Sequence, residues 1–181
     1  KTWISVGCGT ARDVEFVTGH VKAAGTKVYL VDLSDALLDM ARARVLELGL
    51  QTQVVLVEGD INSPAVRKKL PKKADLVTCS YCLTMIPPWK EALATMLDLV
   101  EVGGNLALID FVTREGREKR FFQKLYKWWF AMDGVYFNRG HVDWLRAQKN
   151  LATIWYSEEE SRVPYTPYHP THYLYCAEKT A

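Results

Sequence analysis

Short apolar runs alternate along this chain with longer segments in which apolar residues recur every three or four positions. The short runs predict β-strands near residues 2–6, 27–31, 53–57, 74–79, 105–110, 151–157 and 171–177. The longer segments predict helices near residues 11–24, 35–48, 64–70 and 89–100. Because strands alternate with helices, the pattern predicts an α/β fold with a doubly wound, mostly parallel sheet.

The first two predicted strands end in chemically distinctive residues. Gly7 and Gly9 follow the first strand, and glycine lets a backbone turn sharply and approach a ligand where a Cβ would clash. The second strand ends at Asp32, where a carboxylate can accept both ribose hydroxyls of an adenosine cofactor. A structural turn at the glycines and a helix cap at Asp32 are the alternatives.

The spacing of the residues around the glycine turn distinguishes three kinds of nucleotide or cofactor site. A P-loop motif does not occur in the chain, which excludes that kind of phosphate site. A dinucleotide fingerprint places glycine where this chain has Arg12, so a Rossmann oxidoreductase is disfavoured. S-adenosylmethionine has no phosphate and needs only a glycine turn, a ribose acid and an adenine pocket. The sequence therefore favours S-adenosylmethionine as the cofactor.

Ligands of doubly wound sheets bind beyond the carboxyl ends of the strands. That rule places further candidates on one rim with the glycine turn, namely Asp60, residues 79–85 and Asp110. Asp60 follows Gly59, so a plain turn is its alternative role. Ser34 and Asp35 are the candidate N-caps of the helix near 35–48, and Gly49 is predicted to end it.

Composition limits the class of protein further. A length of 181 residues suits a single domain over 1–181, and the net charge of +2 gives no electrostatic argument for a nucleic-acid partner. No apolar run approaches the roughly 18 residues of a membrane span, and no signal peptide is recognised. The four cysteines are interpreted as reduced thiols, which predicts a cytoplasmic protein. Because the chain opens directly on a strand, we expect it to be part of a longer polypeptide.

Two motifs remain ambiguous. Cys79 and Cys82 have the CxxC spacing, but no second pair exists, so no metal site is predicted. Residues 112–150 are expected to form a helical substrate or lid segment after the fifth strand. Its basic positions are Arg117, Arg120, Lys124 and Lys127, and its apolar positions are Phe121, Phe122, Leu125, Trp129 and Met132. Such an amphipathic helix can lie in a membrane interface, cap an apolar substrate, or simply pack on the core.

The order of these motifs resembles class I S-adenosylmethionine-dependent methyltransferases over nearly the whole chain. More narrowly, three segments resemble the N-methyltransferase part of betaine lipid synthases. They are Gly7-Cys8-Gly9-Thr10-Ala11-Arg12, Ser80-Tyr81-Cys82-Leu83-Thr84-Met85-Ile86-Pro87 and Ile109-Asp110-Phe111, followed by a Trp-rich stretch that leads to Asp133-Gly134-Val135. One departure is Ser5, because class I enzymes usually carry an acid there that helps to hold the methionine amino group.

The resemblance implies a role for each cofactor-binding residue. The methionine part would be bordered by Gly7, Cys8 and Gly9, with Thr10 beside them. The ribose would meet Asp32 and the adenine would meet Leu33, Asp60 and Ile61. Ser80 would lie near the sulfonium. The implied fold is the Rossmann-like methyltransferase fold.

The resemblance also implies methylation of the homoserine amine of diacylglyceryl-homoserine in betaine lipid synthesis. The predicted catalytic residues are Tyr81, Asp110 and His141, with His169 and His172 as weaker histidine candidates. A quaternary ammonium product favours aromatic faces, and the cage candidates are Tyr81, Tyr126, Trp128, Tyr136 and Tyr168.

The expected partners are an amine-bearing lipid or small molecule, a membrane surface contacted peripherally, and a fused or associated aminocarboxypropyl transferase. Two other functions stay open at this point. One is a soluble methyltransferase of small amines such as phosphoethanolamine, and the other is a non-catalytic interaction module.

Overall fold

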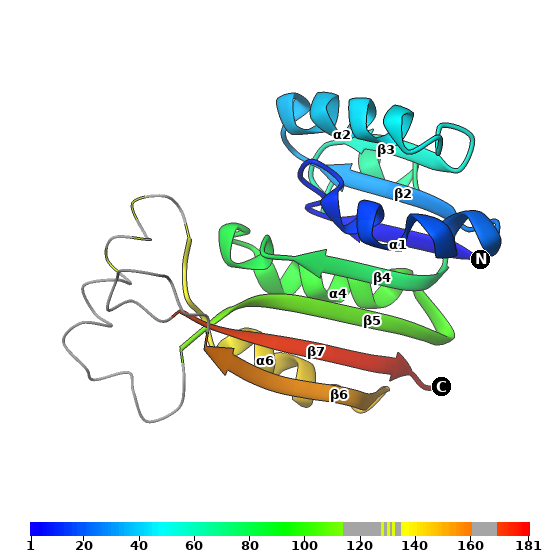
Figure 1. Ribbon diagram of the computed structural model, residues 1–181. Coiled ribbons are helices and arrows are strands. Elements are labelled where there is room, and N and C mark those ends of the chain that lie inside the picture. Colours follow the sequence, from blue (N-terminus) through cyan, green and yellow to red (C-terminus); the bar gives the residue numbers. More distant parts are fainter. Residues whose placement is uncertain (114–127, 129, 131, 133–134, 161–169) are drawn as a thin grey trace.

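A computed structural model describes residues 1–113, 128, 130, 132, 135–160 and 170–181 (Figure 1). The predicted amphipathic helix of the 112–150 segment therefore lies mostly outside the described residues. No helix among the described residues is long and apolar enough to cross a membrane.

A seven-stranded sheet forms the centre of the fold, in the order β3-β2-β1-β4-β5-β7-β6. Its strands are β1 (Thr2–Val6), β2 (Lys27–Asp32), β3 (Val54–Glu58), β4 (Ala74–Ser80), β5 (Val100–Val112), β6 (Leu151–Glu160) and β7 (Thr171–Lys179). The first five strands pair in parallel, whereas β7 runs antiparallel to both β5 and β6. The predicted doubly wound, mostly parallel sheet is thus confirmed.

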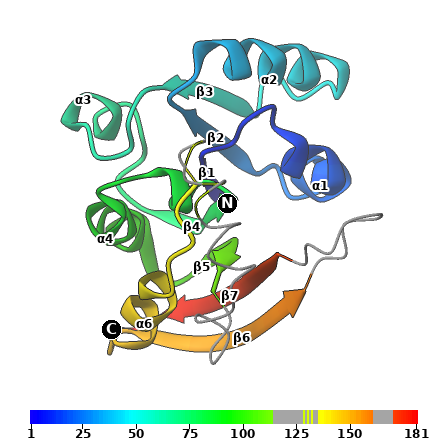
Figure 2. The same ribbon diagram turned by 90° about the vertical axis from the view of Figure 1, so that its left-hand side faces the viewer.

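Helices cover both faces of the sheet (Figure 2). They are α1 (Arg12–Ala23), α2 (Asp35–Glu47), α3 (Pro64–Arg67), α4 (Trp89–Leu99) and α6 (Gly140–Arg146), with a 3-10 turn, η1, at Leu83–Met85. Val14 of α1 and Ala41 of α2 pack in one core layer with alternate side chains of β1–β3. Leu93 of α4 and Leu145 of α6 pack in the second layer, on the opposite face.

Local signals explain where helix α2 begins and ends. The Ser34 side chain accepts a hydrogen bond from the Leu37 backbone N–H at 3.3 Å, which satisfies one of the free amides of the first turn. Gly49 adopts φ +64° just beyond the helix, a conformation that glycine tolerates without a Cβ clash. Both expectations for this helix are confirmed.

Some element boundaries differ from the expected ones. Strand β5 begins at Val100, which pairs with Ala74 of β4. The register of the two strands then shifts between Ala74 and Leu76, and the chain passes Gly103 at φ +82°. Glycines in a strand often accompany such a bulge, whereas the pattern of apolar residues predicted a strand only from residue 105. Helix α3 ends at Arg67, three residues early, and α6 lies inside the 112–150 segment that was expected to be helical.

Candidate active site

The glycine turn after β1 lies against two other strands. The Gly7 and Cys8 amides donate to the Val31 carbonyl of β2 at 2.8 and 3.1 Å. A Cβ added at Gly7, which has φ +65°, would lie 2.2 Å from Cys82 Sγ beyond β4, so no side chain fits there. A Cβ added at Gly9 would meet nothing within 4 Å of described residues. The turn is therefore closed toward β4 and open at Gly9, where a ligand can approach its backbone.

Asp32 joins the glycine turn to the end of β2. Its Oδ2 accepts from the Gly9 amide at 2.8 Å, and its Oδ1 accepts from the Ser34 amide at 3.0 Å. Each carboxylate oxygen can accept a further hydrogen bond. Next to it, the Leu33 side chain is 74% exposed. A half-buried acid beside an exposed apolar side chain suits a ribose with its attached base.

The turn after β3 lies beside Asp32, because the Gly59 amide donates to the Asp32 carbonyl at 2.9 Å. Asp60 is exposed at this turn, and its Oδ1 accepts from the Asn62 amide at 2.9 Å. Ile61 is only 3% exposed and packs in the core beneath the turn. The structure thus brings Asp32 and Asp60 to one rim, as the sequence predicted.

Arg44 of α2 holds the glycine turn from outside. Its Nη1 donates to the Thr10 hydroxyl at 2.8 Å and also to the Thr10 carbonyl, while its Nε pairs with Glu15 at 3.4 Å. These contacts fix residues next to Ala11, which adopts a left-handed φ of 59° although it is not glycine. Arg44 therefore belongs to the frame of the site. Its role could not be predicted from the sequence, because α2 is far from the turn in the chain.

Replacing Arg44 by Met is expected to weaken binding of S-adenosylhomocysteine about tenfold, because charge-assisted hydrogen bonds that preorganise the turn are lost. Calorimetric titration measures the change. Arg42→Met is the matched control on the same helix, since Arg42 pairs only with Asp39 among described residues at the exposed surface. Equal affinities for the two variants would show that Arg44 does not preorganise the turn.

The end of β4 carries a strained aromatic residue. Tyr81 has φ 50°, its amide donates to the Ile109 carbonyl at 2.8 Å, and its side chain is 42% exposed. A non-glycine residue in this conformation costs free energy, and such residues concentrate at functional sites. Ser80, directly before it, is half-buried on the sheet.

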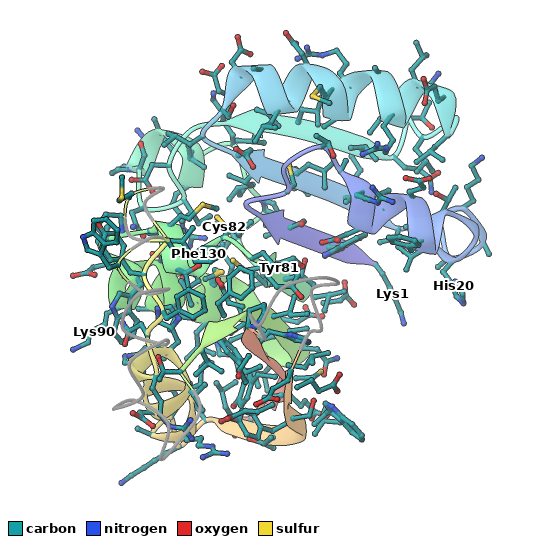
Figure 3. All side chains as sticks on the ribbon, turned by 60° about the vertical axis from the view of Figure 1, so that its left-hand side comes forward. Lys1, His20, Tyr81, Cys82, Lys90 and Phe130 are labelled. Carbon is teal, nitrogen blue, oxygen red and sulfur yellow. The ribbon has the colours of Figure 1, made fainter. Side chains whose placement is uncertain are left out.

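Tyr81 is part of an aromatic cluster at the rim, formed by Tyr81, Phe111, Phe130, Phe137 and His172 (Figure 3). The Phe111 ring centroid lies 5.1 Å from that of Tyr81 and 5.3 Å from that of Phe137. Phe130 and Phe137 meet edge to face at 5.4 Å. Aromatic faces in this arrangement can enclose a flat ring or a cation.

Among the predicted cage residues that the structure describes, Tyr81 is the one whose ring contacts place it in this aromatic cluster. Trp128 and Tyr136 are 65% and 57% exposed, and Tyr126 and Tyr168 lie outside the described residues. The sequence analysis did not assign Phe111, Phe130 or Phe137 to the cage. The Ile109-Asp110-Phe111 motif was the available signal for Phe111.

Asp110 is buried directly behind the aromatic cluster. Its Oδ1 accepts from the Thr84 hydroxyl at 2.8 Å and from its neighbour's amide, and its Oδ2 accepts from the Thr84 amide at 3.0 Å. Burial raises the pKa of this carboxyl, and the Thr84 hydrogen bonds oppose that rise. The contacts place Asp110 as the support of the η1 turn, which begins two residues after Tyr81.

His141, the histidine predicted to be catalytic, is 1% exposed on α6. Its ring meets Trp89 edge to face at 4.8 Å, and its Nδ1 has no hydrogen-bond partner among the described residues. Burial lowers the pKa of His141 to about 4. The described histidine whose ring meets Tyr81 is His172, at 6.3 Å.

Three thiols surround the glycine turn. Burial, followed by the charge of Asp32, raises the pKa of Cys8 to about 12. A hydrogen bond with Cys82, followed by burial, raises the pKa of Cys79 well above its usual value. The described cysteines are free, and no group of three or more metal-ligating side chains occurs among the described residues.

Comparison with known proteins agrees with this geometry. Residues 4–104 match the family described as "Methyltransferase domain", and the chain belongs to that family. A ubiquinone biosynthesis O-methyltransferase of Nitrosomonas europaea is 32% identical over 104 residues, which is 58% of this chain and 41% of that protein. A ubiquinone/menaquinone biosynthesis C-methyltransferase of Pseudomonas fluorescens is 27% identical over 106 residues, or 57% and 39% of the two chains.

Solved structures support the fold. A SAM-dependent methyltransferase from Methanosarcina mazei covers 99% of this chain with a TM-score of 0.70, at 13% identity, and the match covers 92% of that chain. The matched part of this chain spans about two fifths of the length of the curated relatives.

The cofactor of this domain is S-adenosylmethionine, and the residues at the rim fit it. The open backbone at Gly9 suits the methionine part, the Asp32 carboxylate suits the ribose, and Leu33 and Asp60 suit the adenine. Ser5 is 2% exposed within β1, so it offers no acid to the methionine amino group. When bound, the cofactor supplies a methyl group on positively charged sulfur.

Proposed function

We propose that this protein is an S-adenosylmethionine-dependent N-methyltransferase that methylates the homoserine amine of diacylglyceryl-homoserine. The observation that carries the proposal is the aromatic cluster beside the end of β4. The Phe111 ring centroid lies 5.1 Å from that of Tyr81 and 5.3 Å from that of Phe137, so several ring faces lie close together. Ring faces attract ammonium and trimethylammonium groups.

Negative charge near the aromatic cluster supports an amine acceptor. Burial, and then the charges of Asp110 and Glu159, raise the pKa of Tyr81. These two carboxylates lie on opposite faces of the sheet at the same rim, and both favour a cation over an anion at the Tyr81 ring. A phosphorylated amine is less suited to this field than a zwitterionic amino acid headgroup.

Exposed apolar side chains support a lipid-borne acceptor. Trp128 and Met132, on either side of Phe130 in the sequence, are 65% and 69% exposed, and Met85 of η1 is 49% exposed. Apolar side chains of this size are typical of surfaces that contact membranes or partners. A peripheral membrane contact and an associated aminocarboxypropyl transferase, which would supply the headgroup, are parts of the proposal that rest on the sequence resemblance.

A second candidate is methylation of an aromatic ring substrate, on oxygen or carbon. The named activities of the curated relatives favour it, since both act in ubiquinone biosynthesis. The aromatic cluster could stack against a phenol as well as a cation. The carboxylate charge near Tyr81 argues against this candidate, because a phenol becomes more anionic as it reacts.

Labelled S-adenosylmethionine distinguishes these functions. Wild-type protein is incubated with diacylglyceryl-homoserine in vesicles, with phosphoethanolamine, and with a demethylated ubiquinol analogue. We expect label only in the betaine lipid series, and loss of that label when Phe111 is replaced by Ala. Label in phosphoethanolamine or in the ubiquinol would overturn the lipid acceptor, and no binding of S-adenosylhomocysteine at all would favour a non-catalytic module.

A further inference from the structure

His172 occupies the second residue of β7, at the rim that carries the aromatic cluster. Its backbone neighbours across the sheet are Phe111 of β5 and Glu159 of β6. Its ring lies 6.3 Å from the Tyr81 ring at an interplanar angle of 62°. His172 is therefore the member of the aromatic cluster that lies opposite Glu159 in the sheet.

The alternation of side chains along the strands defines which groups share the face of His172. Phe111 and Glu159 lie on that face, directly opposite His172. The next register, Asp110, Tyr173 and Glu158, points to the other face, where Tyr173 is fully buried and Glu158 pairs with Arg139 at 3.0 Å. Among the described residues, the titratable groups that face His172 from neighbouring elements include the Glu159 carboxylate and the Tyr81 hydroxyl.

An amine acceptor needs a group at this position that takes a proton. An ammonium nitrogen has no lone pair, so it reacts only after it has lost a proton, and histidine exchanges protons near neutral pH. Tyr81 is unsuited as a base, because its burial and the nearby carboxylates raise its pKa. His141 is held in the core against Trp89.

Glu159 is suited to assist His172. Side chains directly opposite in an antiparallel pair have Cβ atoms about 4.5–5.5 Å apart, within reach of a carboxylate and an imidazole. Glu159 is exposed, and its Oε1 also accepts from the Ser157 hydroxyl at 3.2 Å on the same strand. From the opposite position on a neighbouring strand, a carboxylate can turn to accept from one imidazole nitrogen and so orient the ring.

We propose that His172 accepts the proton of the acceptor amine and that Glu159 orients the His172 imidazole, an inference that rests on the proposed N-methyltransferase function. The ammonium N–H bond breaks, its electron pair stays on nitrogen as the lone pair, and the proton forms an N–H bond on the imidazole. The lone pair then forms the bond to the methyl carbon, while the carbon–sulfur bond of the sulfonium breaks and its electron pair stays on the sulfur of S-adenosylhomocysteine. The half-exposed imidazolium returns the proton to water before the next methylation.

The test compares His172→Gln and Glu159→Gln with His20→Gln, an exposed histidine on α1. We expect kcat/KM for the amine at pH 7 to fall about 100-fold in His172→Gln and about tenfold in Glu159→Gln, with His20→Gln unchanged. The His172→Gln deficit should shrink as pH rises, because the amine then deprotonates in solution. If His172 only lined the acceptor site, its replacement would lower kcat/KM by the same factor at every pH.

Two further readouts are independent of turnover. Binding of S-adenosylhomocysteine should be unchanged in both variants, which also shows that they are folded. In wild-type protein labelled at histidine, the NMR signal of the His172 ring should shift on addition of the trimethylated product. If His172→Gln failed to fold, the exposed Glu159→Gln variant would carry the test through its pH profile.

The failures are distinguishable. Unchanged pH profiles in both variants, with an active wild-type enzyme, would overturn the role of His172 and leave the proposed function intact. A wild-type enzyme that binds S-adenosylhomocysteine and methylates none of the amines would overturn the proposed function itself, and with it the need for a proton acceptor.

Discussion

Replacing Asp32 by Asn is expected to weaken binding of S-adenosylhomocysteine at least about 100-fold, because a carboxylate that accepts from ribose hydroxyls is lost together with an anchor of the glycine turn. In the free protein the two Asp32 oxygens accept from the Gly9 and Ser34 amides. An Asn side chain must turn its NH2 toward one of these donors, so one of the two hydrogen bonds is lost in either orientation. Titration calorimetry measures the affinity.

Asp35→Asn is the matched control for Asp32→Asn. It makes the same chemical change three residues later, at an exposed position in the first turn of α2. We expect its affinity to stay within twofold of wild type, apart from a small loss of helix stability from the removed N-terminal charge. If Asp32→Asn bound the ligand like Asp35→Asn, the ribose site at the end of β2 would be refuted.

Acidification from pH 7 to pH 4 is expected to cost the wild-type protein about 3 kcal/mol more of its unfolding free energy than a His141→Phe variant. Burial lowers the pKa of His141 to about 4 from an ordinary value of 6.5. Between these values the unfolded chain binds a proton that the folded chain does not, so stability falls as pH falls. Phe keeps a ring against Trp89 and carries no titratable group.

Denaturant unfolding at several pH values measures this effect, with His20→Phe as the control for an exposed histidine. The control should follow the wild-type curve throughout. Methyl transfer by His141→Phe at neutral pH decides the catalytic prediction separately. A folded variant without activity would support the predicted catalytic role of His141, whereas full activity would assign the residue to the core.

Much of the fold could be predicted because its signals are local. The apolar runs of β1–β4 are buried on both faces of a parallel sheet, so each run shows itself without knowledge of its neighbours. Gly7, Gly9 and Asp32 could be placed because each follows a strand end, and parallel strand ends share one rim.

The part of the site assigned to the methyl acceptor could not be predicted in the same way, because it forms through pairing of strands that are far apart in the sequence. Phe111 and His172 are 61 residues apart in sequence and become neighbours only through the antiparallel register of β5 with β7. Phe130 and Phe137 join Phe111 from the 112–150 segment, whose helical periodicity does not show which of its aromatic side chains meet β5. For the same reason the sequence could not rank His172 above His141, since nothing local shows which histidine faces Tyr81 and which faces Trp89.

The raised pKa of the Cys8 thiol bears on whether S-adenosylmethionine methylates the protein itself. A thiolate is a strong nucleophile, and a sulfonium methyl group is an electrophile that alkylates thiolates. With a pKa of about 12, roughly one Cys8 side chain in 100,000 is ionised at pH 7. Burial and the Asp32 charge thus allow a cysteine beside the glycine turn without self-methylation, and Cys8→Asp would leave a permanent anion against the Asp32 carboxylate.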